Sequence, residues 1–179
     1  MRVYSREVEG WQAMSPMGDT LVDFSSGWQF GESGILNELA KRFGVRSCCE
    51  IGAGDGDALP VTCDPLIQRW ISCQLFEIDE RKQWKLREKY GLFPVDVCGE
   101  WSLKHQKPCD LLVVDVDSND LEITLDCLSK FKPIILMVEH RDLRINCHHQ
   151  ATLEAIAAAL PDFELLGLTR VNSVYKCKD

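Results

Sequence analysis

The sequence contains no pair of cysteines spaced C-x-x-C, no long apolar run and no excess of basic residues. Because cysteines at that spacing are typical of structural zinc sites, we predict no metal site. An apolar run of about 20 residues is needed to cross a bilayer, so no transmembrane helix is expected. The first ten residues are charged and polar, without the apolar centre of a secretory signal peptide.

Acidic residues outnumber basic residues by 28 to 20, and the formal net charge at pH 7 is -8. Such a protein repels nucleic acids and anionic membrane surfaces, so we expect neither as a partner. The cysteines number nine, which is odd, and they are scattered along the chain. Without a secretion signal, this usage argues against a disulfide framework and predicts a reducing compartment, the cytoplasm.

The chain has 179 residues, of which 45% are hydrophobic and 27% are charged. These fractions are typical of globular proteins, and the length accommodates one domain with a full core. Residues 1–28 show only weak apolar periodicity, and we interpret them as an extension that caps one mouth of the domain. Residues 29–179 are predicted to form a single α/β domain.

The most informative stretch is Cys48 to Asp57, in which a short apolar run ends in Glu50 and alternate glycines follow. These glycines are Gly52, Gly54 and Gly56. The pattern predicts a buried strand that runs into a glycine-rich turn, where a ligand can approach bare backbone. A dinucleotide fingerprint, G-x-G-x-x-G, would need glycine at position 57, where this chain has aspartate.

The acid before the first glycine distinguishes between cofactors. Glu50 would repel a pyrophosphate, but it could accept hydrogen bonds from a cationic amine. S-adenosylmethionine carries such an amine and no phosphate, so the pattern favours S-adenosylmethionine over NAD. The alternative is a glycine-rich turn that binds no ligand.

Apolar periodicity alternates between strand and helix along most of the chain. Helices are predicted over residues 32–43, near 65–69, and over 81–90, 120–130 and 150–160. Strands are predicted over residues 45–51, 71–78, 92–97, 109–116, 133–139, 163–168 and 172–177. This order predicts a mainly parallel, seven-stranded sheet with helices on both faces, ending in a hairpin.

Polar residues gather where the predicted strands end, which is where ligands bind to such sheets. Glu77 lies 21 residues after Gly56 and is placed to bind both ribose hydroxyls, while Asp79 caps the next helix. Asp96 and Val97 are expected to hold the adenine edge. The predicted cofactor-binding residues are Glu50, Gly52, Ala53, Gly54, Asp55, Gly56, Glu77, Ile78, Asp96, Val97 and Asp115.

An acidic cluster follows the strand predicted over 109–116. Alternation points Asp115 and Asp117 to the same side, where clustered carboxylates serve as a base or hold a hard metal ion. Asn119 and Asp120 equally suit the start of the next helix. His140, with an unperturbed pKa near neutrality, follows the strand that ends at Glu139. The predicted catalytic residues are Asp115, Asp117, Glu139 and His140.

Five segments together resemble the FkbM-type class I methyltransferases, which use S-adenosylmethionine and mostly methylate oxygen. The segments are Gln29 to Leu36, Glu50 to Gly56, Trp70 to Asp79, Asp115 to Asp120 and Pro133 to Glu139. Their order and spacing agree with that family over about residues 29–140. The resemblance implies a Rossmann-like class I fold whose last strand is antiparallel.

Two residues depart from the family pattern. Ser118 stands where the family usually has glycine, and Arg141 stands where it often has asparagine. Both lie on the substrate side, so they bear on the acceptor more than on the cofactor. We predict a methyltransferase that O-methylates a small molecule or a sugar. The alternatives are an inert cofactor- or nucleoside-binding module of the same fold, and an NAD-dependent oxidoreductase.

Overall fold

The computed structural model describes residues 32–58, 61–140, 150–169 and 171–178, and two short strands before them. These are β1 (Ala13–Met14) and β2 (Thr20–Leu21), which pair antiparallel. The rest of the predicted N-terminal extension lies outside the described residues, so its capping role stays a prediction. No described helix is both long enough and apolar enough to span a membrane.

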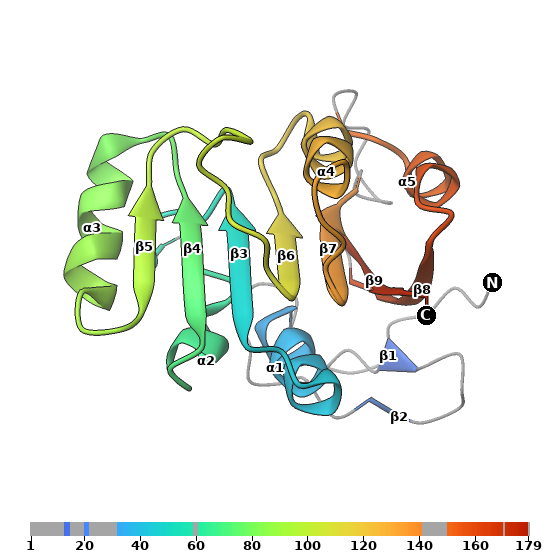
Figure 1. The fold of residues 1–179 in the computed structure, drawn as a ribbon, viewed down its shortest axis with the longest axis horizontal. Coiled ribbons are helices and arrows are strands. Elements are labelled where there is room, and N and C mark those ends of the chain that lie inside the picture. Colours follow the sequence, from blue (N-terminus) through green and yellow to red (C-terminus); the bar gives the residue numbers. More distant parts are fainter. Residues whose placement is uncertain are drawn as a thin grey trace.

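Seven strands form the central sheet, with the order β5-β4-β3-β6-β7-β9-β8. They are β3 (Ser47–Ile51), β4 (Ser72–Phe76), β5 (Val95–Cys98), β6 (Leu111–Val114), β7 (Ile135–Glu139), β8 (Phe163–Leu168) and β9 (Asn172–Cys177). The pairs from β5 to β7 are parallel, whereas β9 runs antiparallel to both β7 and β8 (Figure 1). The predicted fold class is confirmed, including the antiparallel last strand.

The direction of strand succession changes at β3. From β3 the chain adds β4 and β5 on one side, and later β6 and β7 on the other. A crevice forms at such a switch point, because the connections leave the sheet in opposite directions. The glycine turn follows β3 directly, so the fold places it at the crevice.

Within the part of the chain that the structure describes, five helices accompany the sheet. They are α1 (Glu32–Phe43), α2 (Asp64–Ile67), α3 (Glu80–Tyr90), α4 (Asp120–Leu128) and α5 (Leu153–Ala159). The predicted cap of α3 is confirmed, because the carboxylate of Asp79 accepts hydrogen bonds from the backbone N–H groups of Arg81 and Lys82. Helix α5 begins later than predicted, because Thr152 caps it and accepts from the N–H of Ala155.

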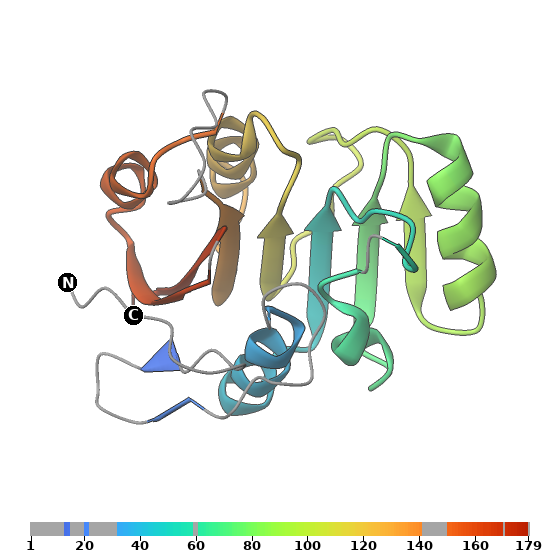
Figure 2. The same ribbon diagram turned by 180° about the vertical axis from the view of Figure 1, so that it is seen from behind.

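The core has two layers, one on each face of the sheet. Helices α1, α2 and α3 cover the face that carries Cys48 and Val113. Helices α4 and α5 cover the opposite face, which carries Cys49 and Leu112. Figure 2 shows α1 and α2 toward the amino ends of the strands, which leaves the carboxyl ends to the connecting loops. Strands β6 and β7 are buried throughout, as their unbroken apolar runs predicted.

One strand begins later than predicted. The sequence pattern placed a strand at 92–97, but β5 spans Val95–Cys98. Leu92 is exposed, and Pro94 has no N–H to donate to a ladder, although its carbonyl accepts from Cys73. The carboxyl end of β5 therefore lies past Asp96, which changes the residues that reach the ligand-binding edge.

Candidate functional site

A cavity of about 900 Å³ opens at the carboxyl ends of the parallel strands. Its volume lies within the range of roughly 300–1,000 Å³ typical of small-molecule pockets. The predicted site residues that line it are Glu50, Gly52, Gly54, Glu77, Ile78, Asp115, Asp117 and Glu139. The edge of the sheet chosen from the sequence is thus the edge at which the cavity lies.

Gly52 brings the backbone of the turn close to a neighbouring strand. Its φ is +90°, and a Cβ added there would lie 1.8 Å from the carbonyl oxygen of Asp115. The N–H groups of Gly52 and Ala53 both donate to the carbonyl of Phe76, at 2.9 and 3.0 Å. Only glycine meets both demands at position 52, so the turn presents bare backbone to the cavity.

Glu77 reaches the cavity, but it also holds the turn. Its Oε2 accepts from the N–H of Gly54 at 2.9 Å, and its Oε1 accepts from the N–H of Asp79 at 3.0 Å. The ammonium of Lys82 lies 3.9 Å from Oε2. We expected Glu77 to bind the ribose hydroxyls; in the structure its carboxylate has these three partners and also lines the cavity.

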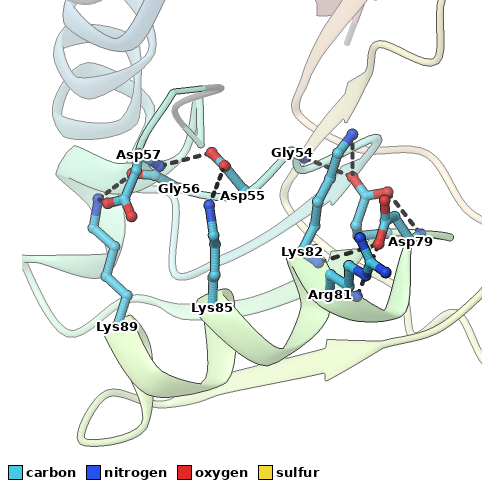
Figure 3. Close-up of polar contacts among 10 residues, drawn as sticks. Gly54, Asp55, Gly56, Asp57, Asp79, Arg81, Lys82, Lys85 and Lys89 are labelled. Atoms are coloured by element: carbon cyan, nitrogen blue, oxygen red, sulfur yellow. Dashed lines mark hydrogen bonds and ion pairs between the residues drawn. The ribbon is translucent and has the colours of Figure 1, made fainter.

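The outer half of the turn faces α3 instead of the cavity. Figure 3 shows Lys82, Lys85 and Lys89 pointing from α3 toward the turn. The Nζ of Lys85 lies 2.8 Å from the carboxylate of Asp55, and Lys89 donates to the carbonyl of Gly56. Asp55 and Gly56 therefore do not line the cavity, contrary to their predicted cofactor contacts.

Three other predicted contacts also lie away from the cavity wall. Ala53 is 1% exposed and belongs to the apolar core. Asp96 and Val97 lie within β5 because this strand begins late, and Asp96 pairs with Lys107 at 3.0 Å. The residues at this corner of the cavity are Glu100 and Trp101. These two residues, an acid and an aromatic just past the strand, could have been predicted from the sequence. They were missed because the strand was predicted to end too early, at residue 97.

Glu50 forms part of the cavity wall, yet its carboxylate is committed to the backbone. The side chain is 2% exposed. Its two oxygens accept from the N–H groups of Thr62 and Cys63, each at 2.8 Å. Burial raises the pKa of Glu50 to about 8, against the opposing effect of these hydrogen bonds. The carboxylate therefore fixes the segment before α2 to β3.

Three carboxylates meet on the other side of the cavity. Strand alternation was expected to bring Asp115 and Asp117 together, but both residues lie beyond the end of β6 at Val114. Oxygens of Asp115, Asp117 and Glu139 lie within 4.8 Å of one another. Asp117 has a φ of +64°, which is rare for a residue with a side chain, and its N–H donates to Glu139 at 3.2 Å. Such a set of oxygens can take up a proton or hold a hard cation.

Burial, and then repulsion from neighbouring acids, raises the pKa values of two of these carboxyl groups. Burial, then the charges of Asp120, Glu32 and Asp117, raise the pKa of Asp115 to about 7. Burial, and then the charge of Asp115, raise the pKa of Glu139 to about 9. A carboxylate that titrates near neutral pH is suited to act as a general base.

His140 does not reach the cavity. It is 0% exposed, and its backbone N–H donates to the carbonyl of Val171 at 2.7 Å. The cavity is lined instead by Val171 and by Glu139, the residue of β7 just before His140. Because successive side chains along a strand point to opposite faces, Glu139 and His140 do not both face the ligand.

Glu32 is a further acid that reasoning from the residues did not single out. It begins α1 and is 3% exposed. Its Oε1 accepts from Thr169 Oγ1 at 2.9 Å and from Asn172 Nδ2 at 3.0 Å. Since its charge also raises the pKa of Asp115, it stands beside the acidic cluster. The cavity-lining residues that were not predicted include Thr62, Phe76, Lys82, Glu100 and Trp101.

No protein-family model matches the chain, and no curated protein matches it in sequence. Solved structures do share its fold. An O-methyltransferase from Bacillus cereus in complex with SAH has 16% sequence identity and a TM-score of 0.58, and the match covers 81% of this chain and 80% of that one.

Two further structures are similar. For the O-methyltransferase TomG from Streptomyces achromogenes in complex with SAM, identity is 16%, the TM-score is 0.56, and 83% of this chain and 80% of that one are covered. For the N-methyltransferase NodS from Bradyrhizobium japonicum WM9, identity is 13% and the TM-score is 0.57, and the match covers 83% of this chain and 97% of that one. The chain thus has the Rossmann-like fold that these methyltransferases share.

Proposed function

We propose that the protein is an S-adenosylmethionine-dependent methyltransferase that O-methylates a small molecule or a sugar. The observation that carries this proposal is the excess of acidic over basic residues in the cavity wall. Six lining residues are acidic, namely Glu50, Glu77, Glu100, Asp115, Asp117 and Glu139. The single basic residue among the described lining residues is Lys82. S-adenosylmethionine carries a sulfonium and an ammonium. A cation beside these acids lowers the raised pKa values of Glu50, Asp115 and Glu139, so the wall can bind it as carboxylates.

The same wall argues against NAD. A pyrophosphate binds to free backbone N–H groups at a glycine turn and a helix N-terminus. Here the N–H of Gly54 already donates to Glu77, and the N–H groups of Gly52 and Ala53 donate to Phe76. The turn therefore offers a bare surface without these donors, next to carboxylates that would repel the phosphates.

The lining residues suggest how the two ligands lie. Gly52 and Gly54 allow an adenosyl group to approach the backbone, and the ring of Trp101 can stack on a base. The cofactor supplies an activated methyl group, so the protein mainly aligns acceptor and donor and excludes water. Asp115, with its pKa near 7, accepts the proton that a hydroxyl acceptor loses.

The finer assignment, to the FkbM-type group, is also a proposal. It is supported by the placement of Glu32, which belongs to the segment from Gln29 to Leu36 that resembles this group. In the structure Glu32 stands beside Asp115, the first residue of the acidic segment that also carries the resemblance. The side chain of Asn172, which donates to Glu32 Oε1 and hydrogen-bonds to Asp115, thus links two segments that lie far apart in the sequence.

Ligand binding tests the proposed cofactor. S-adenosylhomocysteine at about 100 times its dissociation constant should stabilise the fold by about 2.7 kcal/mol, whereas NADH should have no effect. Trp101→Ala should weaken binding, while Trp84→Ala, which removes an exposed ring on α3, should not. Stabilisation by NADH alone would refute the cofactor assignment.

Transfer of a labelled methyl group separates an enzyme from an inert module of the same fold. Incubation with labelled S-adenosylmethionine and fractionated small-molecule extracts should yield a labelled product. Asp115→Asn should bind S-adenosylhomocysteine but lose transfer. Binding without transfer to any fraction would favour the inert module.

A further inference from the structure

Three cysteines from different parts of the fold meet inside the protein, away from the cavity. Cys48 lies on β3, Cys73 lies on β4, and Cys63 is the N-cap residue of α2. Their sulfur atoms lie within 4.8 Å of one another, and the three residues are 0–2% exposed. None of the three lines the cavity. We call this group the trithiol cluster.

The backbone determines the geometry of the trithiol cluster. Cys48 and Cys73 are directly paired in the parallel register of β3 and β4, so their side chains lie side by side on one face of the sheet. Cys63 is held to the same face because Glu50, two residues after Cys48, accepts from the N–H groups of Thr62 and Cys63. Two strands and a buried carboxylate thus bring three sulfurs together.

A neighbouring cysteine shows what an ordinary buried cysteine looks like here. Cys49 is also fully buried, but it points to the opposite face and packs in the layer beneath α4 and α5. Buried cysteines often serve as small apolar residues, so burial alone indicates no site. Among the residues that the structure describes, only the trithiol cluster brings three sulfurs within this distance.

We propose that Cys48, Cys63 and Cys73 form a buried binding site for Cu(I). Thiolate ligands select Cu(I), zinc and iron–sulfur clusters. Structural zinc is almost always bound by four ligands, and iron–sulfur clusters are held by four cysteines. Among the described residues, the group of possible ligand atoms within 4.8 Å of one another holds these three sulfurs and no fourth donor. Three sulfur donors suit Cu(I), which forms trigonal complexes with thiolates.

Binding requires no redox partner. The ion enters and stays as Cu(I), sulfur–copper bonds replace sulfur–hydrogen bonds, and the displaced protons pass to solvent. Cys63 directly follows Thr62, which lines the cavity.

Competition with a coloured Cu(I) chelator tests the site. Fully reduced protein, titrated under argon with Cu(I) in the presence of bicinchoninate, should withdraw one equivalent of copper per chain. Copper binding should be weakened by each of three substitutions, Cys48→Ala, Cys63→Ala and Cys73→Ala. Removing a residue that only supports a metal ligand weakens binding by about 10–100-fold, so the loss of a ligand itself should exceed that range. Cys49→Ala, a buried control on the other face of the same strand, should bind copper like the unmodified chain.

A second measurement uses the unmodified protein, so it does not depend on the folding of variants. Slow alkylation followed by peptide mass spectrometry reports the reactivity of each cysteine. Cu(I) should protect Cys48, Cys63 and Cys73 together and leave Cys49 unchanged. The proposal is overturned if all four alanine variants retain copper equally, if other cysteines are the protected ones, or if Zn²⁺ binds the cluster more tightly than Cu(I).

Discussion

The glycine turn and the acidic cluster lie at the same edge of the sheet, but they balance charge in opposite ways. On the turn, Asp55 pairs with Lys85 of α3, and Glu77 accepts two backbone N–H groups. In the cluster, Asp115 and Glu139 have raised pKa values because they are buried among other acids. The turn is internally neutralised, whereas the cluster gains stability from any proton or cation that it receives.

The largest expected effect concerns the turn. Gly52→Ala should destabilise the protein by more than about 4 kcal/mol, because the new Cβ would overlap the backbone of Asp115. Gly44→Ala is the matched control, since Gly44 also has a positive φ but has no atom within 4 Å of the added Cβ. It should cost only about 1 kcal/mol. Urea denaturation measures both; equal losses would mean that the close approach at Gly52 does not matter.

The acidic cluster should respond in the opposite direction. Asp115→Asn removes a charge from a crowded group, so the unliganded protein should become more stable at pH 8. If Asp115 is the base, methyl transfer should fall by about 100-fold or more. Thermal unfolding and a transfer assay on the same preparation test the two parts. A loss of both stability and transfer would mean that Asp115 is a structural residue.

The pH dependence follows from the same charges. An acid whose pKa is raised by folding binds protons more tightly when folded, so its stabilising contribution is complete below its unfolded pKa of about 4. That contribution is lost as the pH rises toward 7 for Asp115 and toward 9 for Glu139. Glu50, whose pKa is raised to about 8, contributes in the same direction. At about 1.4 kcal/mol for each pH unit and each acid, the unliganded protein should therefore lose several kcal/mol of stability between pH 5 and pH 8. Chemical denaturation at several pH values measures the slope, which Asp115→Asn should flatten.

The smallest effect is expected at the surface of α3. Lys85→Ala removes the partner of Asp55, but the ammonium is exposed and its interaction is weakened by solvent. Stability should fall slightly, and the difference from the unmodified protein should disappear in high salt. Thermal unfolding at low and high salt checks this. A large loss that persists in high salt would mean that the turn depends on this ion pair.

The elements that were predicted well have signals within their own segment. The apolar run of β7 and the capping residue Asp79 needed no knowledge of the rest of the chain. The errors arose where a distant partner decides the outcome. Asp55 is buried and faces α3, where its carboxylate pairs with Lys85, which lies 30 residues later. His140 is buried beside a backbone carbonyl from the turn between β8 and β9.

The trithiol cluster illustrates the same limit of local patterns. The spacings between Cys48, Cys63 and Cys73 match no metal motif, so the sequence analysis predicted no metal site. Their convergence depends on the register of β3 with β4 and on the clamp formed by Glu50. Neither feature is visible in the spacing of the residues.

The left-handed backbone of Asp117 implies that this position is a compromise. An aspartate at a φ of +64° carries a conformational cost of roughly 1 kcal/mol or more that glycine would not have. Replacing it with glycine would relax the loop while deleting a carboxylate, whereas asparagine would keep the shape and remove only the charge. The difference between the unfolding free energies of these two variants indicates how much stability the left-handed conformation costs when position 117 carries a side chain.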